Sequence, residues 1–299
     1  MATGNYTHGA ALAPTGQRGH TAAHERSSLS SRAEAVGYPE DLLVWRRAQR
    51  SPSTVSTTRI SVIIPTLNEA GCLPQTFRSL PDAANLEVIV VDGGSNDGTA
   101  DVAERAGARV LRLPPGRALQ MNAGAAAARG SVLLFLHADT RLPRGFFSAV
   151  EAEMRKPGVV GGAFRLRIDA PGWPLRIIEG AVHIRSCVLQ VPYGDQGIFV
   201  RKETFQELGG FAMLPIMEDV DFIRRLRRLG RIRIVPLSAT TSGRRWQELG
   251  PWKTTWINQK IVFGYCIGIS AQRLADWYHR ARRPENHPLT GHPMPGDGR

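Results

Sequence analysis

Two side chains that could bind a metal ion stand just beyond an apolar run of the sequence. The run spans residues 132–136, and His137 and Asp139 follow it. Mg²⁺ and Mn²⁺ prefer oxygen ligands, and such an ion commonly bridges phosphate oxygens to one or two carboxylates. If the strand persists through these residues, both side chains point the same way. We therefore expect Asp139 to bind Mn²⁺ or Mg²⁺, with His137 either as a further ligand or as a hydrogen-bonding neighbour.

A second acidic group, Glu218, Asp219 and Asp221, lies at the start of a predicted helix. Acids in this position often only cap the helix and interact favourably with its dipole. A carboxylate near a bound phosphate and metal ion could instead take a proton from an attacking hydroxyl group. General base catalysis is therefore the alternative to a purely structural role for this group.

Polar loops follow the first two predicted strands, at residues 65–69 and 92–99. Nucleotides bind where a strand passes through a polar turn into a helix. Two adjacent glycines in the second loop permit a tight turn and a close approach of the backbone to a ligand. Asp92 can accept hydrogen bonds from a base or a ribose, whereas Asp97 is better explained as a turn or cap residue.

The elements that must position these residues alternate along the first half of the chain. Strands are predicted at 60–65, 86–91, 109–113 and 132–136, and helices at 73–80, 99–106 and 117–128. Strands alternating with short helices imply right-handed βαβ units and a mostly parallel sheet, with ligands beyond the carboxyl ends of the strands. The second half is predicted to add strands at 161–168, 197–201 and 232–235, and helices at 175–185 and 218–229.

These elements predict an α/β fold in which a mostly parallel sheet is flanked by helices, forming a single catalytic domain at residues 59–250. Residues 1–58 show little periodicity and predict a disordered extension, apart from a short helix at 39–48. Trp-rich helices are expected at 251–284, packed on the domain or at a membrane surface, and a disordered tail at 285–299. The expected location is cytoplasmic, although an extension rich in Arg and Ser could alternatively target an organelle.

The composition limits the class of protein. The 299 residues are 42% hydrophobic, enough for a sizeable core, and they carry a formal net charge of +12. This charge favours anionic partners such as nucleotides, phosphorylated substrates or acidic membrane surfaces. Nucleic acid is not an expected partner, because the basic stretch 224–233 contains no aromatic residue. No apolar run reaches the roughly 20 residues of a membrane-spanning helix.

Taken in order, these motifs resemble the family 2 glycosyltransferases. The motifs are VIIPTLNE at 62–69, VDGGS at 91–95 with DGT at 97–99, HAD at 137–139 and ED at 218–219. The resemblance covers residues 59–280 and implies a GT-A fold, which is a Rossmann-like α/β domain. The segments 117–124, 193–197 and 244–246 further resemble the small family 2 enzymes found with radical-SAM and selenoprotein-type genes.

The resemblance also implies roles for individual residues. The donor-binding residues would be Thr66, Glu69, Asp92, Gly94, Arg117, Asn122 and Ala138. Asp139 matches the last acid of the family's metal-binding Asp-x-Asp motif, whose first acid is replaced here by His137. Asp219 matches the acid that serves as catalytic base. The acceptor or the sugar would be contacted by Asp195, Gln196, Glu218 and Trp246, although Trp246 could equally be a buried core residue.

We therefore expect an inverting, metal-dependent glycosyltransferase that uses a nucleoside diphosphate sugar, above all a UDP-sugar, and an acceptor that the sequence does not identify. A nucleotidyltransferase-like enzyme is the alternative, but such enzymes carry Lys or Arg just after the first strand, and residues 66–72 contain neither. A peripheral membrane contact is expected through aromatic rings near the C-terminus, unless these rings complete the core: Trp252, Trp256, Trp277 and Tyr278.

Overall fold

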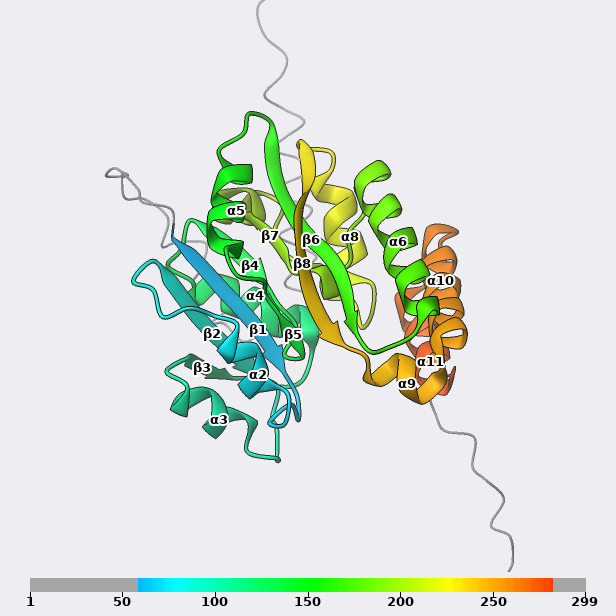
Figure 1. The fold of residues 1–299 in the computed structure, drawn as a ribbon, viewed down its shortest axis with the longest axis horizontal. Coiled ribbons are helices and arrows are strands. Elements are labelled where there is room, and N and C mark those ends of the chain that lie inside the picture. Colours follow the sequence, from blue (N-terminus) through cyan, green and yellow to red (C-terminus); the bar gives the residue numbers. More distant parts are fainter. Residues whose placement is uncertain (1–58, 282–299) are drawn as a thin grey trace, which may run out of the picture. The chain divides into compact units, whose positions relative to one another are not determined.

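The computed structural model describes residues 59–281, and Figure 1 shows their helices and strands. The predicted extension 1–58, with its short helix at 39–48, and the predicted tail 285–299 lie outside the described residues. Within the described part, eight strands form one sheet in the order β3-β2-β1-β4-β7-β6-β8-β5.

The first half of the chain forms parallel strands, as the alternating pattern predicts. β1 (Ile60–Thr66) pairs with β2 (Leu86–Asp92) on one side and with β4 (Val132–Phe135) on the other, and β3 (Arg109–Arg112) extends the sheet beyond β2. The connecting helices are α2 (Leu73–Arg78), α3 (Thr99–Arg105) and α4 (Arg117–Ala127). All of these elements lie within a few residues of their predicted positions.

The second half of the chain places one strand of opposite direction, β7, at the centre of the sheet. β7 (Ile198–Arg201) runs antiparallel to β4, and β6 (Val159–Asp169) runs antiparallel to β7. β8 (Arg231–Ser242) is parallel to β6, and its far end pairs with the short β5 (Thr140–Arg141). The helices here are α5 (Phe146–Met154), α6 (Trp173–Val188), α7 (Lys202–Glu207), α8 (Glu218–Leu226), α9 (Arg244–Leu249), α10 (Pro251–Cys266) and α11 (Ala271–Ala281), and a single 3₁₀ turn, η3 (Gly194–Gln196), precedes β7.

β8 is longer than the strand predicted at 232–235. Its pairing with β6 shifts register at Pro236, since Phe164 faces Val235 and the next residue, Arg165, faces Ser238. Proline donates no ladder hydrogen bond, so it breaks the strand pattern in the sequence and is tolerated at a bulge. The strand then resumes to Ser242, and this polar extension was not predicted.

The helices α5, α7 and α9 were not predicted either. α5 buries Phe146, Val150 and Met154, which recur every four residues and so line one face of the helix. The signal for α5 was therefore present in the sequence.

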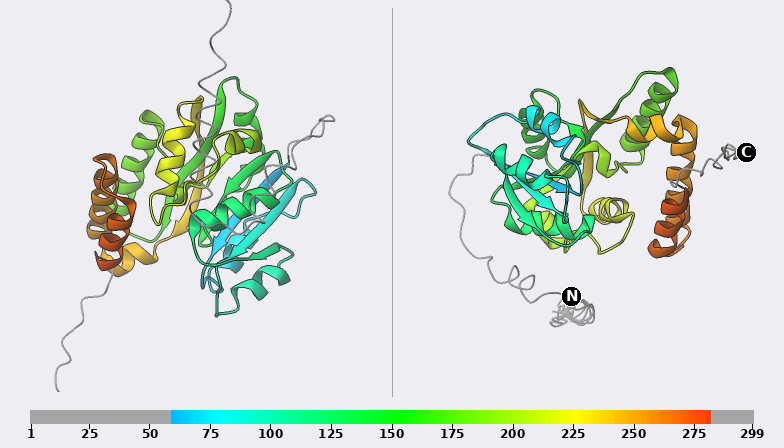
Figure 2. Two further views of the ribbon diagram at one scale, coloured as in Figure 1. Left: turned by 180° about the vertical axis from the view of Figure 1, so that it is seen from behind. Right: turned by 90° about the horizontal axis from the view of Figure 1, so that it is seen from below.

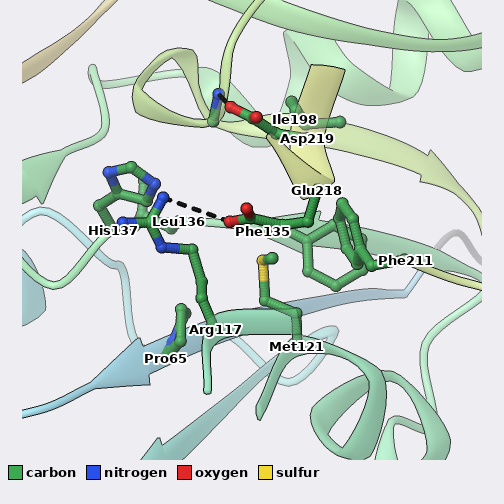
Figure 3. Close-up of a pocket in the computed structure, with 11 residues that line it drawn as sticks. Pro65, Arg117, Met121, Phe135, Leu136, His137, Ile198, Phe211, Glu218 and Asp219 are labelled. Carbon is green, nitrogen blue, oxygen red and sulfur yellow. Dashed lines mark hydrogen bonds and ion pairs between the residues drawn. The ribbon is translucent and has the colours of Figure 1, made fainter. Parts of the chain in front are cut away.

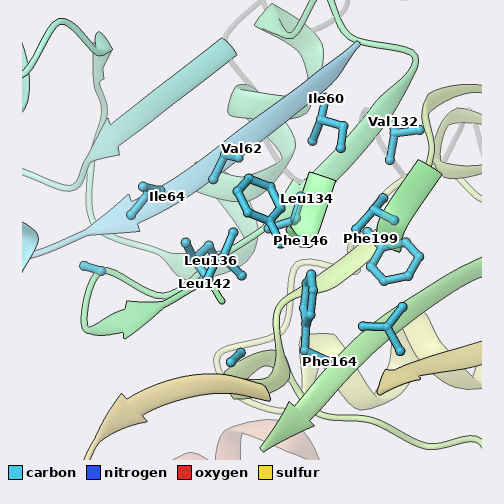
Figure 4. Close-up of a cluster of buried hydrophobic side chains, with 14 of the residues drawn as sticks. Ile60, Val62, Ile64, Val132, Leu134, Leu136, Leu142, Phe146, Phe164 and Phe199 are labelled. Carbon is cyan, nitrogen blue, oxygen red and sulfur yellow. The ribbon is translucent and has the colours of Figure 1, made fainter. Parts of the chain in front are cut away.

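β1 is buried on both faces, which accounts for its unbroken apolar sequence. Val62 and Ile64 point into a core shared with α2, α3 and α5 (Figure 4), whereas Ile63 points into a second core shared with α4, α7 and α8. Helices therefore cover both faces of the central sheet.

The Trp-rich helices predicted near the C-terminus are α10 and α11, which lie together in both views of Figure 2. Ile261 of α10 and Leu274 of α11 pack against Met217 and Val220 at the start of α8. Across residues 59–281, no helix combines the length and apolar character needed to cross a membrane.

α4 lies so close to the sheet that Gly124 has no room for a side chain. A Cβ there would stand 2.4 Å from Cγ2 of Ile63 and 3.1 Å from Cγ2 of Val91. We expect Gly124→Ala to lower the free energy of unfolding by about 1–3 kcal/mol, because α4 must move away from β1 and β2.

Gly180→Ala in α6 is the matched control, since a Cβ there meets no atom within 4 Å. It is expected to raise the free energy of unfolding by roughly 0.4–1 kcal/mol, because alanine restricts the unfolded chain. Urea unfolding measures both variants. A Gly124→Ala protein as stable as Gly180→Ala would contradict the close packing of α4.

Candidate functional site

The side chains of His137 and Asp219 lie close to the backbone of Gly194, where β4 ends and β7 begins. Phe135, the last residue of β4, pairs with Ile198, the first residue of the antiparallel β7. The residues just before β7 therefore lie beside those just after β4. A Cβ on Gly194 would stand 3.0 Å from Nε2 of His137 and 3.2 Å from Oδ2 of Asp219, so the Gly194 backbone lies in close contact with both side chains.

Asp219 lies in the first turn of α8 and is oriented by backbone groups. Its Oδ2 accepts a hydrogen bond of 2.7 Å from the Gly194 amide, and its Oδ1 accepts one of 2.8 Å from the Val220 amide. Asp219 lines a small cavity together with His137 and Arg117 (Figure 3). Because Gly194 lies outside the helix, the carboxylate has a role beyond capping α8.

Arg117 and Glu218 form an ion pair at the same cavity, with 3.3 Å between Nη1 and Oε1 (Figure 3). Arg117 begins α4, and Glu218 begins α8. Burial raises the pKa of the Glu218 carboxyl above its usual range, and the neighbouring Arg117 opposes this effect. The pair places a guanidinium group in the cavity and engages Glu218, which was predicted to contact the acceptor or the sugar.

His137 is held in its neutral form. Burial lowers the pKa of its imidazole well below the usual range, and the charges of Arg117 and Arg245 lower it further. A neutral imidazole can donate one hydrogen bond and accept another. His137 is therefore suited to orienting a hydroxyl group beside Asp219.

Asp139 lies at a different cavity from His137, contrary to the expectation that both side chains point the same way. The expectation fails because β4 ends at Phe135, so the alternation of a strand does not reach these residues. The second cavity has a volume of about 190 Å³ and is lined by Gly71, Cys72, Gln75, Thr76, Asp139, Arg141, Asp169, Thr240 and Ser242.

Arg244 faces the Asp139 carboxylate because of the pairing between β5 and β8. Thr140 pairs with Thr241, and the Ser242 amide donates to the Asp139 carbonyl at 3.0 Å. Arg244 follows directly at the start of α9. Its Nη2 lies 3.6 Å from Oδ2 of Asp139 and donates a hydrogen bond of 3.0 Å to Oε2 of Glu69. Positive and negative groups therefore alternate where a charged ligand could bind.

Whether a divalent ion fits beside Asp139 depends on how many ligand atoms the neighbouring side chains offer. Among the described residues, no group of three or more His, Cys, Asp or Glu side chains could hold a metal ion. Asp139 could therefore bind Mg²⁺ or Mn²⁺ only together with oxygens from a ligand or from water, which is usual for ions that bridge phosphates. The arrangement fits an ion shared with a diphosphate and excludes one held by these residues alone.

Gln120 of α4 fastens the carboxyl ends of β1 and β2 together. Its buried Nε2 donates to the carbonyl oxygens of Thr66 at 2.8 Å and Val91 at 2.7 Å. The Gly93 amide adds a hydrogen bond of 2.9 Å to Thr66, and a Cβ on Gly93 would stand 3.0 Å from Nε2 of Gln120. A side chain at the first glycine of the pair would therefore crowd Gln120.

The two loops beyond these strands are cross-linked to each other. The Asn68 amide donates to the Ser95 hydroxyl at 2.9 Å, and the Glu69 amide donates to the Thr99 hydroxyl at 2.8 Å. Asp97 accepts from the Ala70 amide and from Thr99, and the hydrogen bond from the Thr99 hydroxyl is the main cause of its lowered pKa. Asp97 is therefore a turn residue, as predicted.

Asp92 stands at the end of β2, where it was predicted, but its carboxylate serves its own loop. Oδ2 accepts from the amides of Gly94 at 3.1 Å and Ser95 at 3.0 Å, and Thr66 donates to Oδ1 at 3.3 Å. These bonds shape the loop in which Gly94 has a φ of 88°. The buried Ala138 is engaged through its backbone, because its carbonyl oxygen accepts a hydrogen bond of 2.6 Å from the Thr76 hydroxyl.

Asp195 is a carboxyl group under strong electrostatic influence. Its pKa is raised to about 6, chiefly by burial and in part by Asp219, while Arg185 and Arg245 oppose the shift. Within residues 59–281 its Oδ1 is buried without a hydrogen-bond partner. Such an atom is available to a ligand that brings its own donor.

Gln196 and Asn122 were predicted to contact a ligand, but their side-chain amides form hydrogen bonds within the protein. Gln196 is completely buried, accepts at Oε1 from Arg185, Ser186 and the Tyr193 amide, and donates to the Phe164 carbonyl at 3.0 Å. It cannot face the acceptor or the sugar, because its amide is fully engaged inside the protein.

Asn122 exchanges two 2.9 Å hydrogen bonds with the backbone of Phe211, so it joins α4 to the loop before α8 and does not line the donor site.

Trp246 is a buried residue of the core. It is 8% exposed and packs with Leu166, Ile168, Leu175 and Ile178. The alternative that the sequence left open, a buried tryptophan, is the observed one.

Arg244 and Gln120 were not identified individually from the sequence. Both lie in segments that carry the family resemblance, at 244–246 and 117–124, but only the tertiary contacts reveal what each side chain does. A polar residue on the buried side of the Ala-rich helix α4 was the available signal for Gln120, since buried polar groups are hydrogen-bonded.

The fold and the site can now be compared with known proteins. The chain matches the family model described as "Glycosyl transferase family 2" over residues 61–213, slightly more than half of its length. It is 30% identical over 176 residues to the PGL/p-HBAD biosynthesis glycosyltransferase of Mycobacterium bovis, which covers 54% of this chain and 67% of that protein. The chain spans between about half and two thirds of the length of the curated relatives it matches.

Two solved structures share the fold. One is a mannosyltransferase from Pyrobaculum calidifontis in complex with GDP-Man and Mn²⁺, with a TM-score of 0.55 and 18% identity over 87% of this chain and 77% of that chain. The other is TarS 1–349 from S. aureus in complex with UDP-GlcNAc, with a TM-score of 0.52 and 19% identity over 62% and 58%. The predicted α/β architecture of the GT-A type is confirmed, and the chain belongs to glycosyltransferase family 2.

Proposed function

We propose that the protein is an inverting glycosyltransferase that moves a sugar from a nucleoside diphosphate sugar to the hydroxyl group of an acceptor. The observation that carries this proposal is a pair of carboxylates, each of which lines one of the two cavities. Asp139 lies beside Arg244, and Asp219 lies beside His137. The first arrangement suits a diphosphate and its metal ion, and the second suits acceptance of a proton.

The proposed donor is a UDP-sugar. The two structures that share the fold contain UDP-GlcNAc and GDP-Man, which supports a nucleotide sugar as the class of donor. In this chain the charged groups available to the diphosphate are Arg117 and Arg244, and Glu69 lies beside Arg244. Thr66, Asp92 and Gly94 are proposed to act by shaping the loops that receive the nucleoside.

Mn²⁺ or Mg²⁺ is the proposed cofactor, held by Asp139 together with the donor diphosphate. When bound, the ion would act as a Lewis acid that stabilises the charge on the departing diphosphate. His137 is assigned to the other cavity and is not proposed as a ligand. The Mn²⁺ in the mannosyltransferase structure supports this class of cofactor.

The proposed reaction is a single in-line displacement. The acceptor oxygen forms a bond to the anomeric carbon as the bond from that carbon to the diphosphate oxygen breaks, and the electron pair leaves with the nucleoside diphosphate. Asp219 accepts the hydroxyl proton, His137 orients the hydroxyl group, and Arg117 attracts the departing anion. One displacement inverts the anomeric configuration.

Three finer predictions belong to the same proposal. The subgroup found with radical-SAM and selenoprotein-type genes is supported by the residues that its three segments supply to the two cavities: Arg117 and Gly194 at the first, and Arg244 beside Asp139 at the second. We also propose a cytoplasmic location and a peripheral contact with a membrane. The acceptor is a molecule with a free hydroxyl group.

Asp139→Asn is expected to abolish the Mn²⁺-dependent part of nucleotide binding without changing the fold, because the amide lacks the charge that holds a hard cation. Titration calorimetry of UDP with and without Mn²⁺ measures this. Asp169→Asn is the matched control at the same cavity, since Asp169 is paired with Arg141 at 2.7 Å. Equal Mn²⁺ dependence in wild type and Asp139→Asn would sink the assignment.

Asp219→Asn is expected to lower turnover by roughly 100-fold or more while UDP affinity stays near wild type, because a general base acts in the transition state. Release of UDP from a panel of UDP-sugars measures turnover. Asparagine has one acceptor oxygen, so it keeps only one of the two hydrogen bonds that Asp219 accepts, from the Gly194 and Val220 amides. Thermal unfolding and UDP affinity, measured in parallel, show whether the fold and the donor site are kept.

Asp221→Asn is the control for this variant, because Asp221 lies in the same helix turn but is paired with Arg225 at 2.8 Å. Glu218→Gln tests the neighbouring acid. A larger loss of turnover in Glu218→Gln than in Asp219→Asn would transfer the role of the base to Glu218.

Asp195→Asn is expected to stabilise the protein more at pH 8 than at pH 4. The pKa of Asp195 is about 6 in the folded protein, so between about pH 4 and 6 the folded state keeps a proton that the unfolded chain has lost. The free energy of unfolding therefore falls as the pH rises through this range. Asparagine removes this loss, worth roughly 1–3 kcal/mol. Thermal unfolding at both pH values measures the difference, and an equal effect at pH 4 and pH 8 would contradict the burial of a titrating carboxyl.

A further inference from the structure

α6 exposes an apolar stripe that the sheet does not cover. Trp173, Ile177, Ile184 and Val188 are each more than half exposed and recur at helical spacing on one face. The opposite face is buried in the core. A helix that exposes an apolar stripe opposite its buried face offers that stripe as an interaction surface.

α10 repeats the pattern. Trp252, Trp256 and Phe263 are each more than half exposed at spacings of four and seven residues, and Ile267 continues the stripe just beyond the helix. The inner face buries Thr254, Ile261 and Gly264 instead.

The two stripes meet. The rings of Trp173 and Trp252 lie 6.3 Å apart in an edge-to-face arrangement, and Figures 1 and 2 show α6 and α10 as neighbours at one edge of the described domain. We name this feature the α6–α10 surface; it consists of Trp173, Ile177, Ile184, Val188, Trp252, Trp256, Phe263 and Ile267. A contiguous exposed apolar patch of this kind marks an interaction site.

The charges around the α6–α10 surface are mainly positive. α10 contains no Asp or Glu, and its Lys253 and Lys260 are exposed. Exposed Arg273 and Arg280 follow on α11, alongside the exposed acid Asp276. Glu179, the acid of α6, lies 3.1 Å from Arg176, accepts the Ile168 amide at 2.6 Å and thus faces the sheet.

We propose that the α6–α10 surface docks on an anionic lipid bilayer, with its aromatic rings at the level of the headgroups. Indole rings combine an apolar body with a polar N–H, and lysines beside them bind lipid phosphates, so the two act together at a membrane interface. A second copy of the chain is the less suitable occupant, because a symmetric contact through this surface would bring equal lysine charges together.

The proposed partner adjoins the acceptor side of the site. Arg185 of α6 stacks 3.5 Å from the ring of Tyr193, and Tyr193 also packs with Leu274 and Trp277 of α11. Gly194, which holds Asp219, is the next residue. The membrane contact therefore involves helices that position the proposed catalytic base. Trp277 is partly buried in this cluster, so it belongs to the core and not to the membrane surface predicted from the sequence.

Flotation of the full-length protein with vesicles tests the proposal. We expect it to bind vesicles of phosphatidylcholine with phosphatidylglycerol more tightly than vesicles of phosphatidylcholine alone, and to be released by high salt. Trp256→Ser, Phe263→Ser and Ile184→Ser should each weaken the partition constant at least about tenfold, because each removes apolar area from the contact. Leu229→Ser, at an exposed leucine outside the surface, should have no effect.

UDP affinity and thermal unfolding of each variant, measured in parallel, show that the fold and the donor site are unchanged. The docking proposal is thus independent of the proposed transferase activity, and each can fail without the other. Vesicle binding that the three surface variants leave unchanged would overturn it, as would the absence of binding to anionic vesicles. A dimer in light scattering that Trp256→Ser dissociates would replace the membrane by a second copy of the chain.

Discussion

The antiparallel pairing of β7 with β4 is the constraint on which the site depends. The parallel strands place the loops that follow them, including those after β1, β2 and β4, at the carboxyl edge of the sheet. Because Ile198 faces Phe135, the start of β7 returns to that edge and brings Gly194 beside His137. The Gly194 amide then fixes Asp219 at 2.7 Å. A shift of this register by one residue would separate the acid from the histidine and turn the side chains of β7 to the opposite faces.

A second antiparallel contact completes the charged side of the site. β5 has only two residues, yet its pairing with the end of β8 brings Arg244 to Asp139 and Glu69. The residues of β8 that pair with β5 lie in the polar extension beyond Pro236. The two cavities therefore depend on two strand pairings between segments about 60 and 100 residues apart in sequence.

Burial disfavours the charged forms of two polar groups in this region. It lowers the pKa of His137, as do Arg117 and Arg245, and it is the main cause that raises the pKa of Asp195 to about 6. Shifted pKa values of this kind are common at functional sites. The helices that enclose this region, α6 and α11, also border the apolar α6–α10 surface, so the chemistry and the proposed membrane contact share the same supports.

The sequence by itself determined the parallel first half of the sheet, because the apolar runs of β1, β2 and β4 are local patterns and a helical segment separates each strand from the next. It also placed Asp139, Asp92 and Asp219 at the ends of elements, although the Asp92 carboxylate is buried and bonded to its own loop. The tertiary structure decided which polar groups remain free. Gln196, Asn122 and Trp246 lie in recognisable segments, but each has at least one partner from an element about 30 to 90 residues away, and all three side chains are engaged inside the fold. Local pattern records which residue types are present and their spacing, whereas the partner that satisfies a buried polar group is set by long-range packing.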